Sequence, residues 1–198
     1  MTLVLATENR HKCEEIAMIL RGGLAVTCET LADYPEIHLP PETGSDYAEN
    51  ALQKAVTVAQ KTGHLALGDD SGLEVDALGG APGLYSARFA GESATYAENR
   101  TKLLNLLTPF SDEKRGAKFI CVIAIAHPSG EARIVKGICN GRIADAACGE
   151  GGFGYDPIFF IPAYQKTFSQ LTPSEKNKIS HRGQAVRAAM EMIRTWMV

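Results

Sequence analysis

The sequence predicts an α/β protein, because strand-like and helix-like segments alternate along most of its 198 residues. Near the start, an apolar run at 3–6 precedes apolar residues at helical spacing. Further on, two strand-like runs at 117–126 and 131–140 are joined by His-Pro-Ser-Gly, which is typical of a hairpin and adds antiparallel character. The length allows a sizeable core, so we expect residues 1–198 to form one domain, with two lobes possible.

The elements expected in the first half follow from periodicity and from turn residues. In order, they are a strand at 3–6, a helix capped by residues 7–9 and ending at 22–23, a strand at 24–28, a helix of about five turns from 47 to 63, and a strand at 64–67 ended by Ser71 and Gly72. The second half predicts a long loop at 73–91, a helix at 94–107 capped by Thr95, the hairpin strands, a further strand starting at 141–143, a glycine-rich loop at 149–157, a strand at 158–161 and a helix at 184–197.

Composition excludes several classes of protein. Hydrophobic residues make up 45% and charged residues 22%, which is ordinary for a globular chain, and the net charge of −3 gives no electrostatic case for binding nucleic acid. The five cysteines include no C-x-x-C pair and leave one over, so we expect reduced thiols. No apolar run reaches the roughly 18 residues of a membrane span, and residues 1–6 lack a basic signal region. We therefore expect a cytoplasmic protein that binds neither membrane nor nucleic acid.

The adjacent carboxylates Asp69 and Asp70 are the strongest candidates for chemistry. They follow a short apolar strand, and open α/β sheets collect ligands at the carboxyl ends of their strands. An ordinary solvated turn would also use Asp, Ser and Gly. The constrained, glycine-punctuated segment at 73–91 favours the functional interpretation, since long structured loops tend to be functional.

Two further segments could bind an anion or a metal. The junction between the first strand and helix points backbone N–H groups toward an anion, and Asn9 and Lys12 add a donor and a charge. The alternative is an ordinary cap and a solvated lysine. Glu42 could cap the next helix or serve as another metal carboxylate. Asn50 and Lys54, four residues apart, share one face of that helix.

The glycine-rich loop is neither a Walker A sequence nor a convincing dinucleotide fingerprint. Phe153 and Tyr155 could offer aromatic faces to a flat ligand and Asp156 a directional acceptor, although the aromatics could equally be core residues. The start of the last predicted helix carries a compact basic cluster of Lys176, Lys178, His181 and Arg182. Cations there oppose the helix dipole, so either a ligand or an acid offsets them, or they form an exposed turn.

Five motifs occur in an order and spacing that resemble the inosine/xanthosine triphosphate pyrophosphatase family, and its bacterial house-cleaning members most of all. They span nearly the whole chain: Thr7-x-Asn9-x-x-Lys12; Glu42-Thr43-Gly44 with Asn50-Ala51 and Lys54; Asp69-Asp70-Ser71-Gly72-Leu73 through Gly79-Gly80-x-Pro82-Gly83-x-Tyr85-Ser86-Ala87-Arg88; Phe153-Gly154-Tyr155-Asp156-Pro157; and Ser180-His181-Arg182-Gly183. Two positions depart from the usual pattern. Residues 146–148 lack a proline-containing turn, and Pro41 stands where an additional acid is frequent.

The resemblance implies an elongated mixed sheet in two lobes, with helices packed around it and a central cleft, in a homodimer. It also implies Mg²⁺-dependent hydrolysis of ITP, dITP and XTP to the monophosphate and pyrophosphate, and it assigns the site residues. Asp70 would activate water and, with Glu42, hold Mg²⁺; Asp69, on the opposite face of the strand, would be supportive. The substrate-binding residues would be Thr7, Glu8, Asn9, Arg10, His11, Lys12, Lys54, Ser71, Phe153, Gly154, Tyr155, Asp156, Lys176, His181 and Arg182.

Within this set, Phe153 would stack on the purine, and Lys176, His181 and Arg182 would donate to its 6-oxo group, which disfavours the 6-amino group of ATP. Two other readings compete. A related Maf-type pyrophosphatase would act on pyrimidine or modified nucleotides, and the motifs around Phe153 and His181 argue against it. A non-catalytic nucleotide-binding module would not need the acids Glu42, Asp69 and Asp70.

Overall fold

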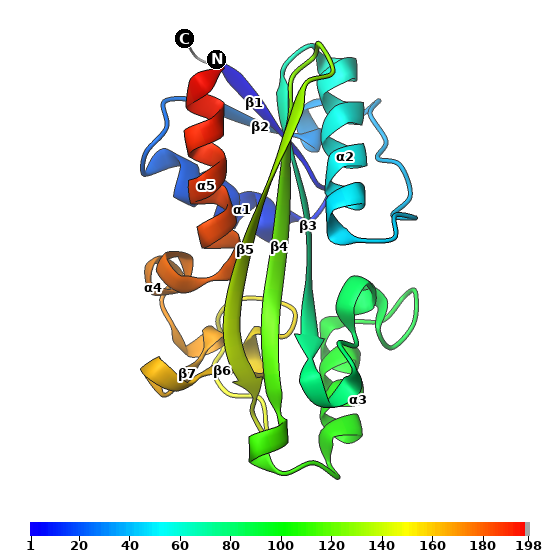
Figure 1. Ribbon diagram of the computed structural model, residues 1–198, viewed down its shortest axis with the longest axis vertical. Helices are drawn as coiled ribbons and strands as arrows, with labels where there is room; N and C mark the ends of the chain where they lie inside the picture. The colour runs from blue at the N-terminus through cyan, green and yellow to red at the C-terminus, as the bar shows by residue number, and fades with distance from the viewer. Residues whose placement is uncertain (197–198) are drawn as a thin grey trace. The chain divides into compact units, whose positions relative to one another are not determined.

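The computed structural model describes residues 1–196 and has a mixed α/β fold (Figure 1). Seven strands form one sheet in the order β2-β1-β3-β4-β5-β6-β7. The strands are β1 (Thr2–Ala6), β2 (Thr27–Thr30), β3 (Leu65–Val75), β4 (Gly116–Ala126), β5 (Ala132–Ile143), β6 (Phe159–Ile161) and β7 (Lys166–Thr167), and the α-helices are α1 (Arg10–Arg21), α2 (Tyr47–Thr62), α3 (Tyr96–Leu107), α4 (Pro173–Ile179) and α5 (His181–Thr195). β1 pairs in parallel with β2 and β3, whereas β6 is antiparallel to β5 and β7. The predicted α/β class and the mixed sheet are confirmed.

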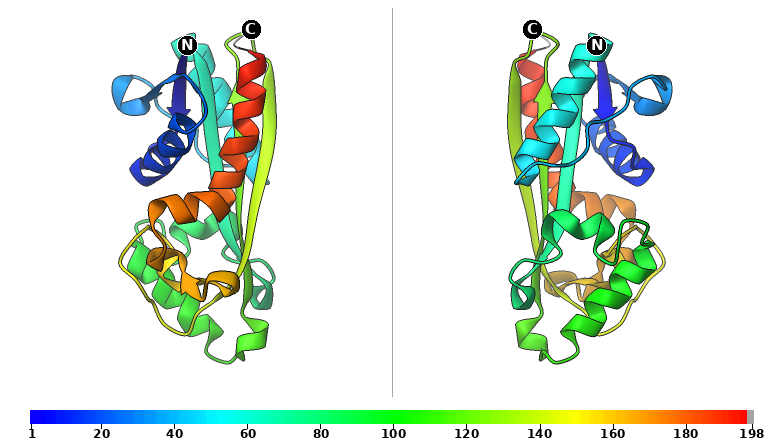
Figure 2. Two further views of the ribbon diagram at one scale, coloured as in Figure 1. Left: turned by 90° about the vertical axis from the view of Figure 1, so that its left-hand side faces the viewer. Right: turned by 90° about the vertical axis from the view of Figure 1, so that its right-hand side faces the viewer.

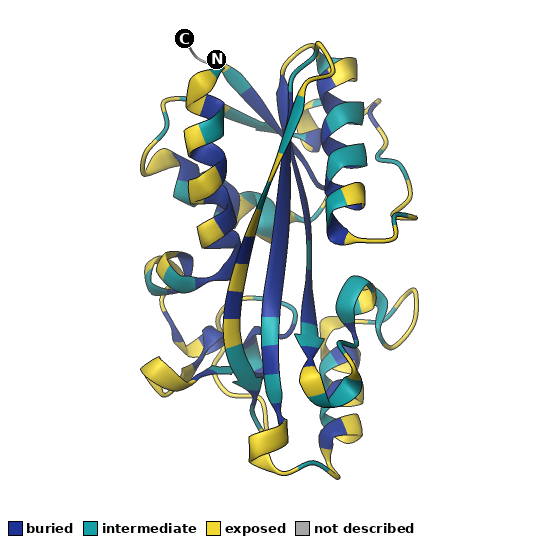
Figure 3. Cartoon of the chain, in the orientation of Figure 1, coloured by how far each residue is buried: buried dark blue, intermediate teal, exposed yellow. Residues whose placement is uncertain are grey.

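The chain divides into two compact units. Unit 1 comprises 1–70, 121–137 and 181–198, and unit 2 comprises 71–120 and 138–180. The long strands β3, β4 and β5 contribute to both units. β3 and β4 are largely buried, whereas β5 is mostly intermediate or exposed (Figure 3). That residues 1–198 form one domain stays a prediction.

Unit 1 places helices on both faces of its strands. α1 and α5 cover one face, where Leu3, Leu5, Leu65 and Leu67 join apolar residues of both helices in a common core. α2 covers the opposite face, as the two side views of Figure 2 show. There the backbone of Gly68 lies so close to α2 that an added Cβ would be 2.3 Å from the carbonyl oxygen of Ala51. The side chains of β3 therefore alternate between an α1/α5 face and an α2 face.

Unit 2 has its own core, built from the ends of β3, β4 and β5, from β6 and β7, and from α3. Three phenylalanines, Phe119, Phe159 and Phe168, form its aromatic centre, with ring centroids 4.6–5.9 Å apart. Leu103 and Leu107 of α3 pack into the same core and are fully buried. This packing fixes α3 beside the loops described below.

The structure corrects several predicted boundaries. β3 does not end at Ser71 and Gly72 but continues to Val75, because Leu73 and Val75 maintain the buried alternation. Residues 141–143 extend β5 and do not begin a new strand, and the strand expected at 24–28 forms at Thr27–Thr30. The hairpin of β4 and β5, and α3 with its Thr95 cap, agree with prediction.

The C-terminal helical region also differs from expectation. α4 was not predicted, although Thr172 and Glu175 form a capping box with Pro173 at the first helical position. α5 begins at His181, three residues earlier than predicted, and the predicted end at Met197 lies outside the described residues. Within residues 1–196, no helix is both long and apolar enough to cross a membrane.

We predict that Gly68→Ala destabilises the protein by about 1–3 kcal/mol, because the new Cβ would overlap the α2 backbone. Equilibrium unfolding in urea measures the change. Gly22→Ala is the matched control: Gly22 has a φ of −73° and its Cβ would lie 3.3 Å from its nearest neighbour. Equal stability of the two variants would contradict the close approach of β3 to α2.

Candidate active site

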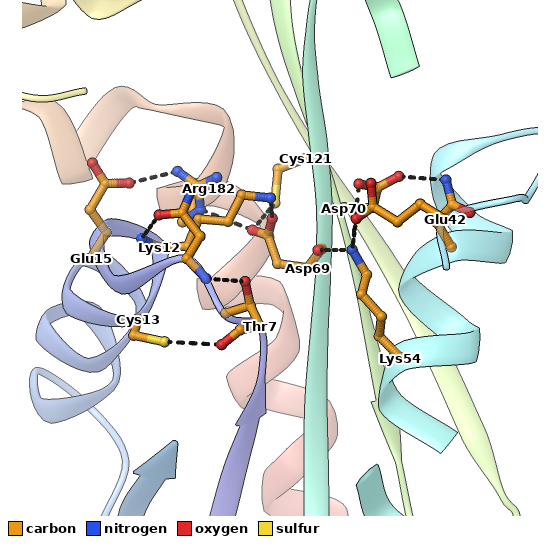
Figure 4. A network of polar contacts seen from close by, with 12 residues as sticks. Thr7, Lys12, Cys13, Glu15, Glu42, Lys54, Asp69, Asp70, Cys121 and Arg182 are labelled. Carbon is orange, nitrogen blue, oxygen red and sulfur yellow. Dashed lines mark hydrogen bonds and ion pairs between the residues drawn. The ribbon is translucent and has the colours of Figure 1, made fainter. Parts of the chain in front are cut away.

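The centre of the site is the pair Asp69 and Asp70 in β3, whose side chains point to opposite faces of the strand (Figure 4). The parallel partner β1 ends at Ala6, opposite Gly68, so both acids lie just beyond the carboxyl end of β1. This is the edge at which open α/β sheets bind ligands. Two consecutive residues thus serve two different side-chain clusters.

Asp69 lies on the α1/α5 face and is completely buried. One oxygen is 2.5 Å from Nζ of Lys12, and the other accepts from Nε of Arg182 at 2.9 Å and from Sγ of Cys121 at 3.2 Å. Arg182 also donates through Nη1 to Glu15 at 2.6 Å. The Asp69 cluster, meaning Asp69, Lys12, Arg182, Cys121 and Glu15, therefore ties β3 and β4 to both α1 and α5.

The electrostatics of this cluster favour an ionised carboxylate. Burial by itself raises the pKa of Asp69, but the charges of Arg182 and Lys12 outweigh that effect and hold the pKa well below its usual range. Burial, and then the charge of Asp69, raise the pKa of the Cys121 thiol well above its usual range. Cys121 thus acts as a hydrogen-bond donor to Asp69 and not as a thiolate.

Asp70 lies on the α2 face, where it meets Asn50 and Lys54. Nδ2 of Asn50 donates to Oδ2 of Asp70 at 3.0 Å, and Nζ of Lys54 is 3.5 Å from Oδ1. The same Nζ lies 2.8 Å from Oε1 of Glu42 and donates to the backbone carbonyl of Asp69 at 2.7 Å. The ammonium group of Lys54 therefore contacts both Glu42 and Asp70. We call Lys54, Glu42, Asp70 and Asn50 the Lys54 cluster.

The two carboxylates of the Lys54 cluster fit a hard divalent ion. Glu42 does not cap α2, because Asp46 does so, and its side chain is 36% exposed. Asp70 is buried, with one oxygen fixed by Asn50. Mg²⁺ is commonly held by one or two carboxylates, with water and phosphate oxygens completing its shell. Among residues 1–196, no group of three or more His, Cys, Asp or Glu side chains is placed to hold a metal ion.

The charge balance of the Lys54 cluster bears on proton transfer. Burial raises the pKa of Asp70, against the opposing charges of Lys54 and Lys12. Burial lowers the pKa of Lys54, but Asp70 and Glu42 outweigh it and the net shift is upward. Lys54 thus stays charged beside a carboxylate with an increased affinity for protons.

The junction of β1 and α1 is organised as an N-cap. Asn9 is the cap residue, and its Oδ1 accepts from the backbone N–H of Lys12 at 3.2 Å. Thr7 is buried, and its Oγ1 accepts from the N–H of Asn9. In the same predicted segment, Glu8, Arg10 and His11 are exposed. The cap turns the first N–H groups of α1 and the Lys12 side chain toward the carboxyl end of β1.

Unit 2 holds a second set of predicted residues, centred on the buried pair Asp156 and Lys176. Oδ2 of Asp156 lies 2.5 Å from Nζ of Lys176 and accepts from the N–H of Phe153 at 2.8 Å. Nζ of Lys176 lies 5.1 Å from the centroid of the Phe153 ring. Gly154 follows in the left-handed region, with φ of 60°. Asp156 therefore shapes the loop that carries Phe153.

Tyr155 takes the alternative role of a core residue. It is 5% exposed, belongs to the core of unit 2, and donates its hydroxyl to the carbonyl of Ser86 at 2.9 Å. Ser86 in turn accepts from the N–H of Leu73 and donates to the carbonyl of Gly83. These bonds hold the segment at 83–88 to the end of β3, close in sequence to the predicted substrate residue Ser71.

The residues of the expected basic cluster lie on two consecutive helices. Lys176 and Lys178 are in α4, and His181 and Arg182 begin α5. Arg182 is 2% exposed, and its charge is offset by acids, as the helix-dipole argument anticipated. The assignment of His181 and Arg182 as donors to a purine stays a prediction.

Sequence reasoning gave no site role to three residues that the structure brings in. The four-residue spacing of Asn50 from Lys54 could have indicated that Asn50 belongs to the site, and Glu15 lies three residues after Lys12 on the same helix. No sequence pattern could have indicated Cys121, because it contacts Asp69 from a position 52 residues away in the sequence.

We predict that Asp69→Asn destabilises the protein by about 3–5 kcal/mol, because the buried charges of Lys12 and Arg182 lose their common partner. Chemical denaturation of purified protein measures the difference. Asp112→Asn serves as control, since that exposed carboxylate pairs with Arg142 at the surface and its loss costs less than about 1 kcal/mol. A loss below about 1 kcal/mol for Asp69→Asn would show that the Asp69 cluster does not stabilise the fold.

The chain is similar to known proteins over nearly its whole length. A dITP/XTP pyrophosphatase of Desulforamulus reducens is 50% identical over 98% of this chain and 96% of that protein. Another, from Exiguobacterium sibiricum, is 45% identical over 100% of this chain and 99% of its own length.

Two solved structures of Ham1 proteins have the same fold as this chain. A HAM1 protein from Coxiella burnetii superposes with a TM-score of 0.87 at 41% identity, covering 98% of this chain and 99% of that one. The Ham1 protein of Staphylococcus aureus gives 0.85 at 38% identity, covering 98% and 99%. The family model of the Ham1 family matches residues 3–192. The chain described here belongs to the Ham1 family.

Proposed function

We propose that this protein hydrolyses the deaminated purine nucleoside triphosphates dITP, ITP and XTP to the nucleoside monophosphate and pyrophosphate. The observation that carries the proposal is the 50% identity, over 98% of the chain, to a protein named dITP/XTP pyrophosphatase. The Lys54 cluster supports it, because attack on a phosphorus atom needs a base, cations and an acidic metal site close together.

Asp70 is the proposed base. Asp70 is buried, and Asn50 holds one of its oxygens in place by donating to it at 3.0 Å. Glu42 and Asp70 would hold Mg²⁺, which when bound would neutralise charge on the phosphate oxygens. Lys54 adds a permanent positive charge between the two carboxylates.

The junction of β1 and α1 is the proposed binding segment for the phosphate chain. Residues 7–12 supply backbone N–H groups at a helix N-terminus, a site suited to anions. Lys12 contributes charge, although in this structure its ammonium group contacts Asp69. The exposed side chains of Glu8, Arg10 and His11 lie within reach of solvent on the same segment.

The proposed binding residues for the base are Phe153, Lys176, His181 and Arg182, with Ser71 as a further substrate contact. Phe153 offers a ring face, and Asp156 and Lys176 fix the loop at 153–156. Donors directed at the 6-oxo group, proposed for Lys176, His181 and Arg182, would face another donor in adenine. An unpaired buried polar group costs about 1–3 kcal/mol, which disfavours ATP.

The wider setting is also proposed. We infer a cytoplasmic enzyme acting on free nucleotides as a homodimer, with no nucleic-acid or membrane partner. All five cysteines lie among the described residues and are free thiols, in keeping with a reducing compartment.

The reaction predicts a specific product. With Mg²⁺ and ITP, XTP or dITP, we expect inorganic phosphate to be released only after an inorganic pyrophosphatase is added, because cleavage falls between the α and β phosphates. ATP is the comparison substrate and should react at least about tenfold more slowly, by the cost of one unpaired donor facing its 6-amino group. Direct release of phosphate would identify a γ-phosphatase and overturn the mechanism.

Substitutions should distinguish the proposed roles of Asp70 and Glu42. We expect Asp70→Asn to lower kcat by about 10²–10⁴-fold, since it removes the base, with little loss of folding. Glu42→Gln should instead raise the Mg²⁺ concentration needed for half-maximal rate, by about tenfold, and retain activity at saturating metal. Metal titrations of initial rate test both.

The same exposed Asp112→Asn variant is the control for these rates. If Asp70→Asn keeps a rate near that of the unaltered protein, another group accepts the proton. If Glu42→Gln leaves the metal dependence unchanged, Glu42 is not a ligand.

A further inference from the structure

The first turns of α3 contact the loop that carries Phe153. Nη1 of Arg100 donates to the backbone carbonyl of Gly154 at 2.8 Å. One helical turn earlier, the ring of Tyr96 lies with its centroid 6.1 Å from that of Phe153, tilted by 47°. Residues four apart share one face of a helix, so Tyr96 and Arg100 present a ring and a cation to the same loop.

α3 is held firmly enough to act as a support. Thr95 and Glu98 form a capping box at its start. The buried side chain of Asn99 accepts from the N–H of Ala90 at 2.7 Å and donates to the carbonyl of Ala87 at 2.9 Å. With Leu103 packed in the core of unit 2, the position of Arg100 is set by the fold and not by the loop that it contacts.

The residues on either side of Gly154 are held by hydrogen bonds. Asp156 accepts from the N–H of Phe153 and pairs with Lys176, and the N–H of Asp156 donates to the carbonyl of Phe153 at 3.1 Å. Between them, Gly154 has a left-handed φ, and a Cβ placed there would meet no atom within 4 Å. Glycine in open space is conformationally permissive, so a contact with its carbonyl restricts the loop where its own bonds do not.

We propose that Arg100 and Tyr96 are positioning residues that hold Phe153 and Gly154 in the conformation that binds the purine. This inference rests on the proposed function of the loop. Arg100 acts on the Gly154 carbonyl through a charge-assisted hydrogen bond, and Tyr96 limits the movement of the Phe153 ring. When only part of the protein has the competent loop conformation, the apparent affinity falls by that fraction.

Arg100→Leu tests the guanidinium, because it retains an apolar side chain on the helix and removes the donor. We expect KM for dITP to rise about five- to tenfold with kcat changed less than twofold. Inhibition by inorganic triphosphate, which has the phosphates and no base, should be unchanged. An arginine that only stabilised unit 2 would lower the folded fraction, and hence kcat, without moving KM.

Tyr96 is tested by a pair of variants. Tyr96→Ala should raise KM for dITP in the same way, and Tyr96→Phe, which keeps the ring, should restore it. Arg142→Leu is the matched control in unit 2, since that arginine pairs with Asp112 and lies over the ring of Phe160. It should leave KM unaltered.

Hydrogen exchange provides a readout that needs no activity. In Arg100→Leu, the amides of Phe153 and Asp156 should exchange several-fold faster than in the unaltered protein and in Arg142→Leu. Three results for Arg100→Leu would overturn the inference. The first is unchanged amide exchange, and the second is faster exchange with an unchanged KM for dITP. The third is an equal loss of affinity for dITP and for inorganic triphosphate. If the unaltered protein hydrolyses none of ITP, dITP or XTP, the proposed function is wrong and the base-binding role falls with it, whereas the exchange data still decide whether Arg100 orders the loop.

Discussion

Two consecutive buried carboxylates in β3 impose the main physical constraint on unit 1. Alternation along the strand sends Asp69 and Asp70 to opposite faces, and a buried charge without a partner costs several kcal/mol. Each face must therefore supply its own cation. Arg182 and Lys12 do so for Asp69, and Lys54 does so for Asp70. Asp69 is thereby paired with two cations inside the fold. Asp70 lies near the exposed side chain of Glu42, and its pKa is raised.

Meeting this constraint requires helices and strands to approach closely, and two glycines permit it. Gly68 lies against the backbone of α2, which carries Asn50 and Lys54. Gly137 in β5 lies against the start of α5, where an added Cβ would be 2.0 Å from the carbonyl oxygen of His181. These contacts bring the cations to the acids.

Unit 2 also contains a buried pair of opposite charges, which fixes a loop and not a strand. The buried pair of Asp156 and Lys176 fixes a glycine-rich loop and leaves the Phe153 ring beside an ammonium group and the Tyr96 ring. A flexible loop that must recognise a flat ligand gains from such supports, because ordering it in advance reduces the entropy lost on binding. Tyr155, the residue after Gly154, packs in the core of unit 2.

Local sequence determined most of the elements. Apolar periodicity, caps and the hairpin turn are properties of neighbouring residues, and they located β1, α1, α2, α3, β4 and β5. They also singled out Asp69 and Asp70, and the i, i+4 face of Asn50 and Lys54. Tertiary structure alone decided that β3 continues through Ser71 and Gly72, and that Arg182, 113 positions away, neutralises Asp69. The physical reason is that strand pairing and burial of charge depend on which distant segments meet, and no local pattern of residues encodes that.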